Sequence, residues 1–223
     1  MINRKAILIG IISIGFLGGC LGAKSEEKLY VAFEKAANQE KTLSDNVKKL
    51  EQLEAKGQEL YNQIIQKGQE NNEEALPQVE QAVANVSERE KELDNEADVL
   101  EKAQKEVTSV LNDINKIEDK KLQEQAKTVE KAYKKRYDAF LKMNGSYKKS
   151  LVIEKELYEK LKEKETKLKE ISEKVKAYNV INEETLKEKE KFNQYTTEYN
   201  KEKLNFYKDA KIKIKEQKPE KKL

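Results

Sequence analysis

The stretch LSDNVKKLEQLEAKGQELYNQI, residues 43–64, decides how the surrounding chain folds. Its large apolar residues recur mostly at steps of three, four or seven, and they include Leu43, Val47, Leu50, Leu60 and Ile64. That spacing places them on one face of an α-helix. Because most other positions carry Lys, Glu or Gln, the stretch predicts an amphipathic helix with a narrow apolar stripe.

The same pattern extends in both directions from this stretch. A first run begins after residues 25–27, where the Ser25 hydroxyl is a candidate cap and two acids suit the first turn, and it stops at Gly68 and Asn71-Asn72. A second run extends from Leu76 to Ile117, with Pro77 near its start, where a missing N–H is tolerated. The short connection predicts antiparallel neighbours.

The later boundaries are less distinct. The apolar phase slips between Ile117 and Leu122, so residues 118–120 form a turn or a skip, and Asn144-Gly145 is a turn or a kink. Residues 182–184 resemble a cap before a last helix. We predict an all-α fold, an elongated antiparallel helical bundle or coiled coil of three to five long helices over residues 25–217, followed by a basic frayed tail at 218–223.

The N-terminus, MINRKAILIGIISIGFLGGC at residues 1–20, has a positive start and an apolar run too short to span a bilayer. Leu17-Gly18-Gly19-Cys20 matches a bacterial lipobox. We predict a signal peptide at 1–19, cleavage between Gly19 and Cys20, a diacylglyceryl group with palmitate-type chains on Cys20, and a tether at 20–24. The alternatives are an ordinary signal peptide with an incidental Cys and an N-terminal membrane anchor.

The composition argues against an enzyme. There is no His, the single Cys is used for lipid, and the only Gly-Gly pair lies in the signal peptide. His-based catalysis, disulfides, Cys-based zinc sites and phosphate loops are therefore excluded, and acid pairs such as Glu73-Glu74 are interpreted as solvated faces. We expect no catalytic residue, no metal and no cofactor. A net charge of +3 also argues against a dedicated nucleic-acid binder.

Tyrosines near the C-terminus are the remaining candidate site. Tyr195, Tyr199 and Tyr207 could stack on sugar rings and contact the cell wall. The alternative is packing along the apolar stripe with each hydroxyl reaching water, and it applies equally to Tyr133, Tyr137 and Phe140. Residues 208–223 carry seven lysines against three acids, so this segment attracts anionic polymers or lipid headgroups, or only solubilises the chain end.

Three segments carry a resemblance to a known family: LYVAFEKAANQEK (29–41), KKLEQLEAKGQELYNQIIQKG (48–68) and EKFNQYTTEYNKEKLNFYKDA (190–210). With the lipobox and the length, they resemble the YkyA-type lipoproteins of Bacillus-like Firmicutes, a family labelled as cell-wall binding. The resemblance implies an acylated, outward-facing helical protein. It carries no catalytic motif, and only Cys20 transfers as a site.

Two functional hypotheses follow. The first is a non-catalytic lipoprotein in the outer leaflet of the cytoplasmic membrane, of Gram-positive type, which binds peptidoglycan or anionic wall polymers. The second is an envelope scaffold that binds another coiled-coil protein or itself, and Gly57 near the apolar phase would allow close helix approach. A transporter's substrate-binding lipoprotein is disfavoured, because no strand pattern is present. The ligand, the oligomeric state and a third acyl chain on Cys20 stay open.

Overall fold

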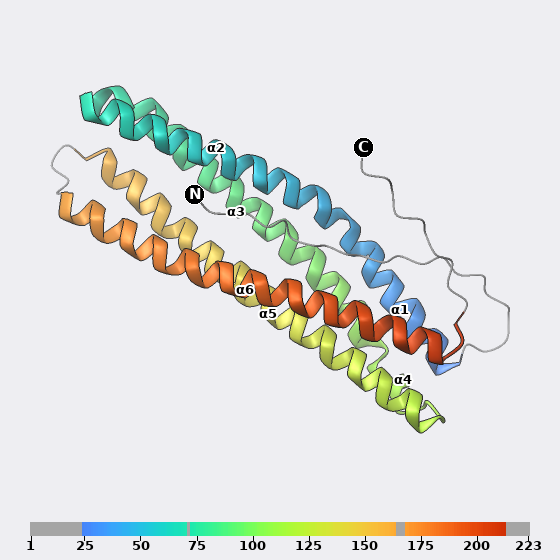
Figure 1. Cartoon of the computed structure of the whole chain (residues 1–223). Coiled ribbons are helices and arrows are strands. Elements are labelled where there is room, and N and C mark those ends of the chain that lie inside the picture. The colour runs from blue at the N-terminus through green and yellow to red at the C-terminus, as the bar shows by residue number, and fades with distance from the viewer. Residues whose placement is uncertain (1–23, 71, 164–167, 213–223) are drawn as a thin grey trace. The chain divides into compact units, whose positions relative to one another are not determined.

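The computed structural model describes residues 24–70, 72–163 and 168–212, and every element in them is helical. The elements are α1 (Ser25–Gln39), the 3-10 turn η1 (Glu40–Thr42), α2 (Leu43–Glu70), α3 (Asn72–Ser109), α4 (Leu111–Ile114), α5 (Lys120–Leu161) and α6 (Leu168–Asp209). The four long helices are α2, α3, α5 and α6, which confirms the all-α prediction (Figure 1).

Most predicted boundaries of the first half agree with the structure. α2 ends at Glu70 and α3 begins at Asn72, where the stop was expected. The cap prediction was wrong, because Ser25 is the first helical residue and no side chain caps this helix. Between α4 and α5 the chain makes a turn, and the Asp119 carboxylate accepts the backbone N–H groups of Lys121 and Leu122 to start α5. This turn settles the ambiguity at residues 118–120.

The second half differs from the sequence prediction. Residues 144–145 lie inside the uninterrupted helix α5, and Asn144 donates to the Leu93 carbonyl at 2.8 Å. The predicted helix start at residues 182–184 is wrong, because α6 continues through it. α5 ends at Leu161, Lys162 and Glu163 leave the helix, and α6 begins at Leu168. The sequence has no Gly or Pro between Leu161 and Leu168, so the helical pattern gave no sign that α5 ends at Leu161.

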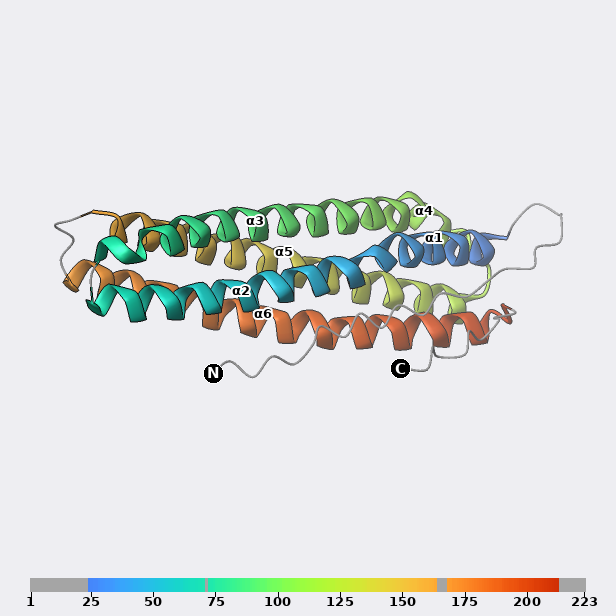
Figure 2. The same ribbon diagram turned by 90° about the horizontal axis from the view of Figure 1, so that it is seen from above.

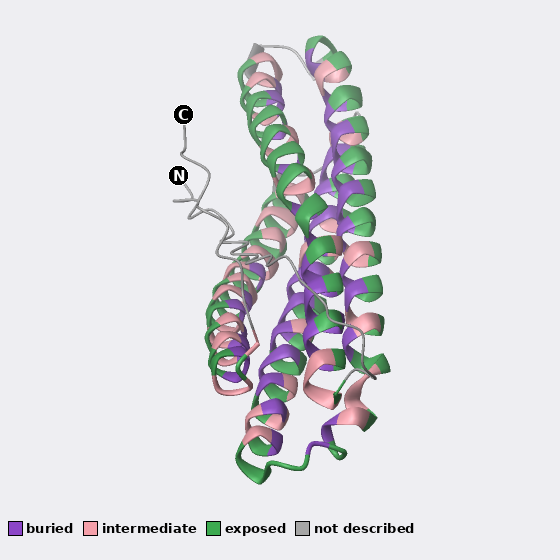
Figure 3. Ribbon diagram, turned by 90° about the vertical axis from the view of Figure 1, so that its right-hand side faces the viewer, coloured by how far each residue is buried: buried purple, intermediate pink, exposed green. Residues whose placement is uncertain are grey.

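The chain groups into two compact units. Unit 1 holds the described residues up to Ser44, Asp98–Ala139 and the described residues from Glu190, whereas unit 2 holds Asp45–Ala97 and Phe140–Lys189. Each unit therefore takes segments from helices that are far apart in sequence (Figure 2). Figure 3 shows buried residues along one side of the helices and exposed residues along the other, as an amphipathic pattern requires.

Unit 1 has an aromatic core, and its helices alternate in direction. Gln125 contacts Asp209 and Arg136 contacts Thr196, so α5 and α6 are antiparallel. The core includes Leu29, Tyr30, Phe33, Ala36, Val107, Val129, Tyr133, Tyr199, Phe206 and Tyr207.

Unit 2 has an aliphatic core from α2, α3 and α5. Lys49 contacts Glu92 and Asn85 contacts Leu53, so α2 and α3 are antiparallel, as predicted. The core cluster includes Leu50, Leu60, Ile64, Val79, Val86, Leu93, Leu151 and Tyr158.

Candidate functional site

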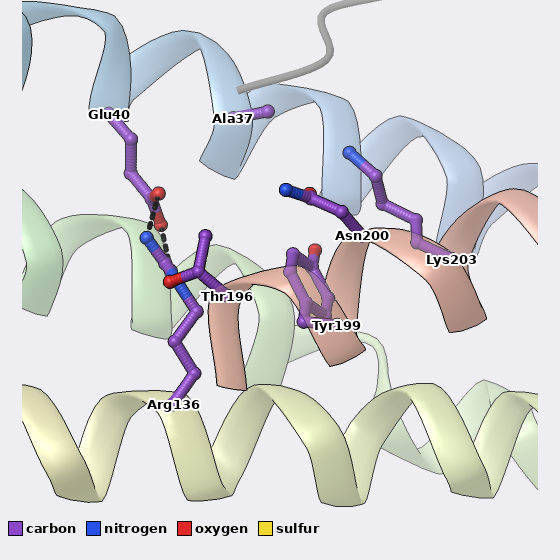
Figure 4. Close-up of a pocket in the computed structure, with 7 residues that line it drawn as sticks. All are labelled: Ala37, Glu40, Arg136, Thr196, Tyr199, Asn200 and Lys203. Carbon is purple, nitrogen blue, oxygen red and sulfur yellow. Dashed lines mark hydrogen bonds and ion pairs between the residues drawn. The ribbon is translucent and has the colours of Figure 1, made fainter. Parts of the chain in front are cut away.

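Two opposite charges meet inside unit 1, where the sequence pattern predicts apolar packing. The Arg136 terminal nitrogens donate to the two Glu40 carboxylate oxygens at 2.8 and 2.6 Å, and both side chains are at most 5% exposed (Figure 4). Arg136 Nε donates to the Thr196 hydroxyl at 3.0 Å. Such a fork-shaped pair, with its donors satisfied, is the arrangement that offsets the loss of hydration.

Aromatic rings surround this guanidinium. Arg136 Cζ lies 5.0 Å from the ring centre of Phe192, 5.9 Å from that of Tyr133 and 6.0 Å from that of Tyr199. These distances are within the range of cation–π attraction. Burial acts to lower the pKa of Arg136, but Glu40 outweighs it and the pKa is raised, so the guanidinium stays charged.

A second buried ion pair joins Lys203, which follows Thr196 on α6, to Glu34. Lys203 Nζ and the Tyr207 hydroxyl both donate to Glu34 Oε1, at 3.1 and 3.0 Å. The Lys203 side chain is 1% exposed, and its Nζ lies 5.6 Å from the Tyr199 ring centre. Burial lowers the pKa of Lys203, although Glu34 opposes the shift, and burial raises the pKa of Tyr207. The phenol therefore stays protonated and serves as a donor to the carboxylate.

A small cavity lies between these pairs. Its volume is about 10 Å³, which is room for about one water molecule. It is lined by Ala37, Glu40, Arg136, Thr196, Tyr199, Asn200 and Lys203, as Figure 4 shows. Within the described ranges, no group of three or more His, Cys, Asp or Glu side chains could hold a metal. This cluster can fix the register of α1, α5 and α6, but it has no room for a substrate.

The structure separates the three predicted wall-contact tyrosines. Tyr207 is 0% exposed and Tyr199 is 6% exposed, and both pack against core rings, so neither can stack on a sugar in this conformation. Only Tyr195 is half-buried, with Lys135 Nζ lying 5.7 Å from its ring centre. The packing alternative therefore describes Tyr199 and Tyr207, except that Tyr207 directs its hydroxyl to Glu34 instead of water.

Unit 2 contains its own buried ion pair. Arg89 donates to Glu154 at 2.5 Å, and the Tyr158 hydroxyl lies 3.4 Å from the same oxygen. Glu96 is also buried, with Oε1 making no hydrogen bond to the described residues. Burial, followed by repulsion from Glu54 and Glu92, raises the pKa of Glu96 to about 7, whereas Lys189 opposes the shift.

Cys20, the predicted signal peptide, the predicted tether up to residue 23 and the basic tail at 218–223 lie outside the described residues. None of the helices in the described part is long and apolar enough to cross a membrane.

A family model named YkyA, with the description "Putative cell-wall binding lipoprotein", matches residues 24–209. The chain belongs to the YkyA family. It is 30% identical over 199 residues, covering 89% of each chain, to "Uncharacterized lipoprotein YkyA" of Bacillus subtilis (strain 168). A Staphylococcus aureus crystal structure, of a conserved protein of unknown function, shares the fold with a TM-score of 0.68. Its sequence is 19% identical, and the match covers 84% of this chain and 98% of that one.

Membership of the YkyA family confirms the resemblance seen in the sequence. The family description names a cell-wall binding lipoprotein. The comparisons name no binding residue.

Sequence reasoning missed the buried charges of this YkyA-family chain. The 45 Lys and Arg residues include only three arginines, and the two that follow Cys20 are Arg89 and Arg136. Each lies three residues after a core residue and four before another, that is, on the apolar stripe. Arginine suits buried pairs better than lysine, because its guanidinium binds a carboxylate through two donors and is weakly hydrated. The rarity of arginine, combined with its position on the apolar stripe, was therefore the sequence signal that could have predicted these buried ion pairs.

Proposed function

We propose that this chain is a non-catalytic lipoprotein, anchored through Cys20 in the outer leaflet of the cytoplasmic membrane, and that it binds the cell wall. The observation that carries the proposal is the order of the sequence: a lipobox at residues 17–20 directly precedes the region matched by the family model, residues 24–209. Two acyl chains on one thiol suffice for stable anchoring, whereas one chain is marginal.

Wall binding is supported by the family description. The small unit 1 cavity points to contact along an outer surface of the helices. Tyr195 is the one predicted tyrosine whose ring remains partly accessible, and Lys135 beside it is paired with Glu198 at 3.1 Å. A partly accessible aromatic face is suited to stacking on a sugar ring.

Gly57 does not support the scaffold alternative, which interpreted this residue as a point of close approach to a partner helix. A Cβ atom added there would lie 2.8 Å from Asn85 Oδ1, within unit 2. The glycine therefore serves contact between α2 and α3 of the same chain.

The test uses residues 21–223, which include every residue that the structure describes. Purified wall sacculi are mixed with this protein and sedimented, next to an unrelated coiled coil of similar net charge. We expect this protein to pellet with the sacculi and the unrelated coiled coil to stay in solution. Equal pelleting of the two proteins would remove the wall-binding part of the proposal.

A further inference from the structure

One outward face of α5 in unit 2 carries exposed aliphatic side chains. Leu141 and Val152 are 48% and 52% exposed. They are three helical turns apart, so they lie on the same side of the helix. Gly145 lies between them, and a Cβ added there would meet no atom within 4 Å. The surface along this line is therefore open.

Lysines border this line on both sides. At 100° per residue, Lys142 and Lys149 fall on one side of Gly145, whereas Lys148 and Lys155 fall on the other. Lys148 pairs with Asp94 at 2.5 Å. Among the described residues, no carboxylate oxygen forms an ion pair with the Nζ atom of Lys142, Lys149 or Lys155. These three lysines and the two aliphatic residues, Leu141 and Val152, are called the α5 face below.

The sequence around the α5 face is unusual for this chain. Charged residues make up 39% of the whole sequence, with nearly equal numbers of each sign, yet residues 139–153 contain three lysines and no acid. Of the acids that follow, Glu154 is bound to the buried Arg89 and Glu156 is bound to Lys174. Asp138 and Glu159 lie one turn beyond the two ends of the α5 face, so its excess of positive charge is confined to the stretch between them.

We propose that the α5 face binds a linear, phosphate-bearing polyanion of the cell wall, an inference that rests on the proposed function and gives it a site and a ligand class. The three lysines follow one another along the helix axis over ~20 Å, at ~1.5 Å per residue, so they match an extended chain of anions better than a single ion. Ammonium groups bind phosphate as point charges and need no fixed geometry.

The aliphatic residues favour a polymer over a bilayer. A helix that inserts into a membrane interface buries a broad apolar face with Trp, Phe or Leu. The α5 face offers only Leu141 and Val152, separated by three turns, while the opposite side of α5 is occupied by the core of unit 2. Two separated aliphatic groups are enough to contact the CH groups of sugar or polyol units.

The test compares the full chain, purified in detergent, with the triple variant Lys142→Gln, Lys149→Gln, Lys155→Gln. The matched control removes three other exposed lysines of unit 2, through Lys91→Gln, Lys176→Gln and Lys187→Gln. Binding is measured to intact sacculi, to sacculi stripped of phosphate polymers by acid, to purified poly(glycerol phosphate) and to phosphatidylglycerol vesicles.

The unaltered chain and the control are expected to bind intact sacculi and poly(glycerol phosphate), more weakly as salt rises. The triple variant should lose roughly 100-fold in affinity, given about fivefold for each of three surface lysines. Equal losses in the control and triple variants, or undiminished binding to stripped sacculi, would overturn the proposal. Lysine-dependent binding to vesicles but not to the polymer would reassign the face to the membrane and overturn it too.

These binding measurements distinguish a failure of the proposed wall-binding function from a failure of the α5 face as its site. If the chain binds no sacculi but still binds poly(glycerol phosphate) through the three lysines, the proposed function fails and the ligand class of the α5 face stands. If sacculi are bound equally by all three proteins, the proposed function stands and the α5 face is wrong.

Discussion

Arg136 on α5 and Glu40 at the end of α1 form a two-pronged ion pair inside unit 1, with contacts of 2.8 and 2.6 Å. The pair joins the N-terminal helix, the part of the described chain nearest to the predicted lipid anchor, to a helix about a hundred residues further along the sequence. Desolvation of two charges makes such a pair neutral for stability when intact and costly when halved.

Replacing one partner of this pair should therefore destabilise the protein strongly. Arg136→Met leaves the Glu40 carboxylate buried and unpaired, and we expect the free energy of unfolding to fall by about 3 to 5 kcal/mol. Combining it with Glu40→Leu should restore most of the loss. Urea unfolding followed by circular dichroism measures both, and Lys56→Met, in the exposed pair with Glu59, serves as control. A cost below ~1 kcal/mol for Arg136→Met would contradict the assignment.

The hydroxyl of Tyr207 should matter for stability, whereas that of Tyr195 should not. Tyr207→Phe removes the donor to Glu34 at 3.0 Å, and we expect a loss of about 1 to 3 kcal/mol. Tyr195→Phe, at the half-buried position, should change stability by less than ~0.5 kcal/mol. Thermal unfolding of the two variants compares them directly, and similar melting temperatures would count against the buried hydrogen bond.

Glu96 should make unit 2 less stable as the pH rises. Its pKa is raised to about 7 in the folded chain, so the folded state holds a proton that the unfolded state releases near its ordinary pKa. The stabilisation is complete below about pH 4.5 and is lost towards about pH 7, by up to about 3 kcal/mol.

Glu96→Gln should remove this part of the pH dependence, because glutamine stays neutral. The measurement is the free energy of unfolding at a series of pH values between about 5 and 8. Glu88→Gln, an exposed glutamate on the same helix, controls for the loss of one charge. If the wild type and Glu96→Gln keep parallel profiles over this range, the carboxyl is not held neutral as described.

Gly57 in α2 and Gly145 in α5 should respond differently to alanine. Gly145→Ala adds a methyl group in open space and should stabilise α5 by roughly 0.5 to 1 kcal/mol. Gly57→Ala brings a methyl group to 2.8 Å from the Asn85 side chain, which is held by the Leu53 carbonyl, so the clash offsets that gain. Equal stabilisation of both variants in urea would show that α2 and α3 pack less closely there.

The sequence predicted the helical class and the apolar residues well, for a definite reason. Helical spacing of Leu and Val reports which face is buried, and Leu29, Leu50, Leu60 and Leu93 are indeed in the cores. The same logic failed at the end of α5, because helix-favouring Lys162 and Glu163 follow Leu161, and at residues 182–184, where cap-type residues lie inside α6.

The buried charges were unpredictable in detail because their partners come from distant segments. Glu40 lies 96 residues from Arg136, and Glu34 lies 169 residues from Lys203. The position of Arg136 on the apolar stripe indicates that its guanidinium is buried. Only the packing of α1 against α5 and α6 shows which carboxylate accepts its hydrogen bonds. The burial of Tyr199 and Tyr207 agrees with the packing alternative that the sequence left open beside wall contact.

The most direct test of the account is the fate of Cys20 in cells. In a cell that expresses the full chain, labelled palmitate should enter the wild-type protein, and its mature N-terminus should be Cys20. The Cys20→Ser variant should incorporate no label and accumulate as the uncleaved precursor. Labelling that is unchanged in Cys20→Ser, or a mature chain that begins at another residue, would contradict the proposal of a lipid-anchored wall-binding protein.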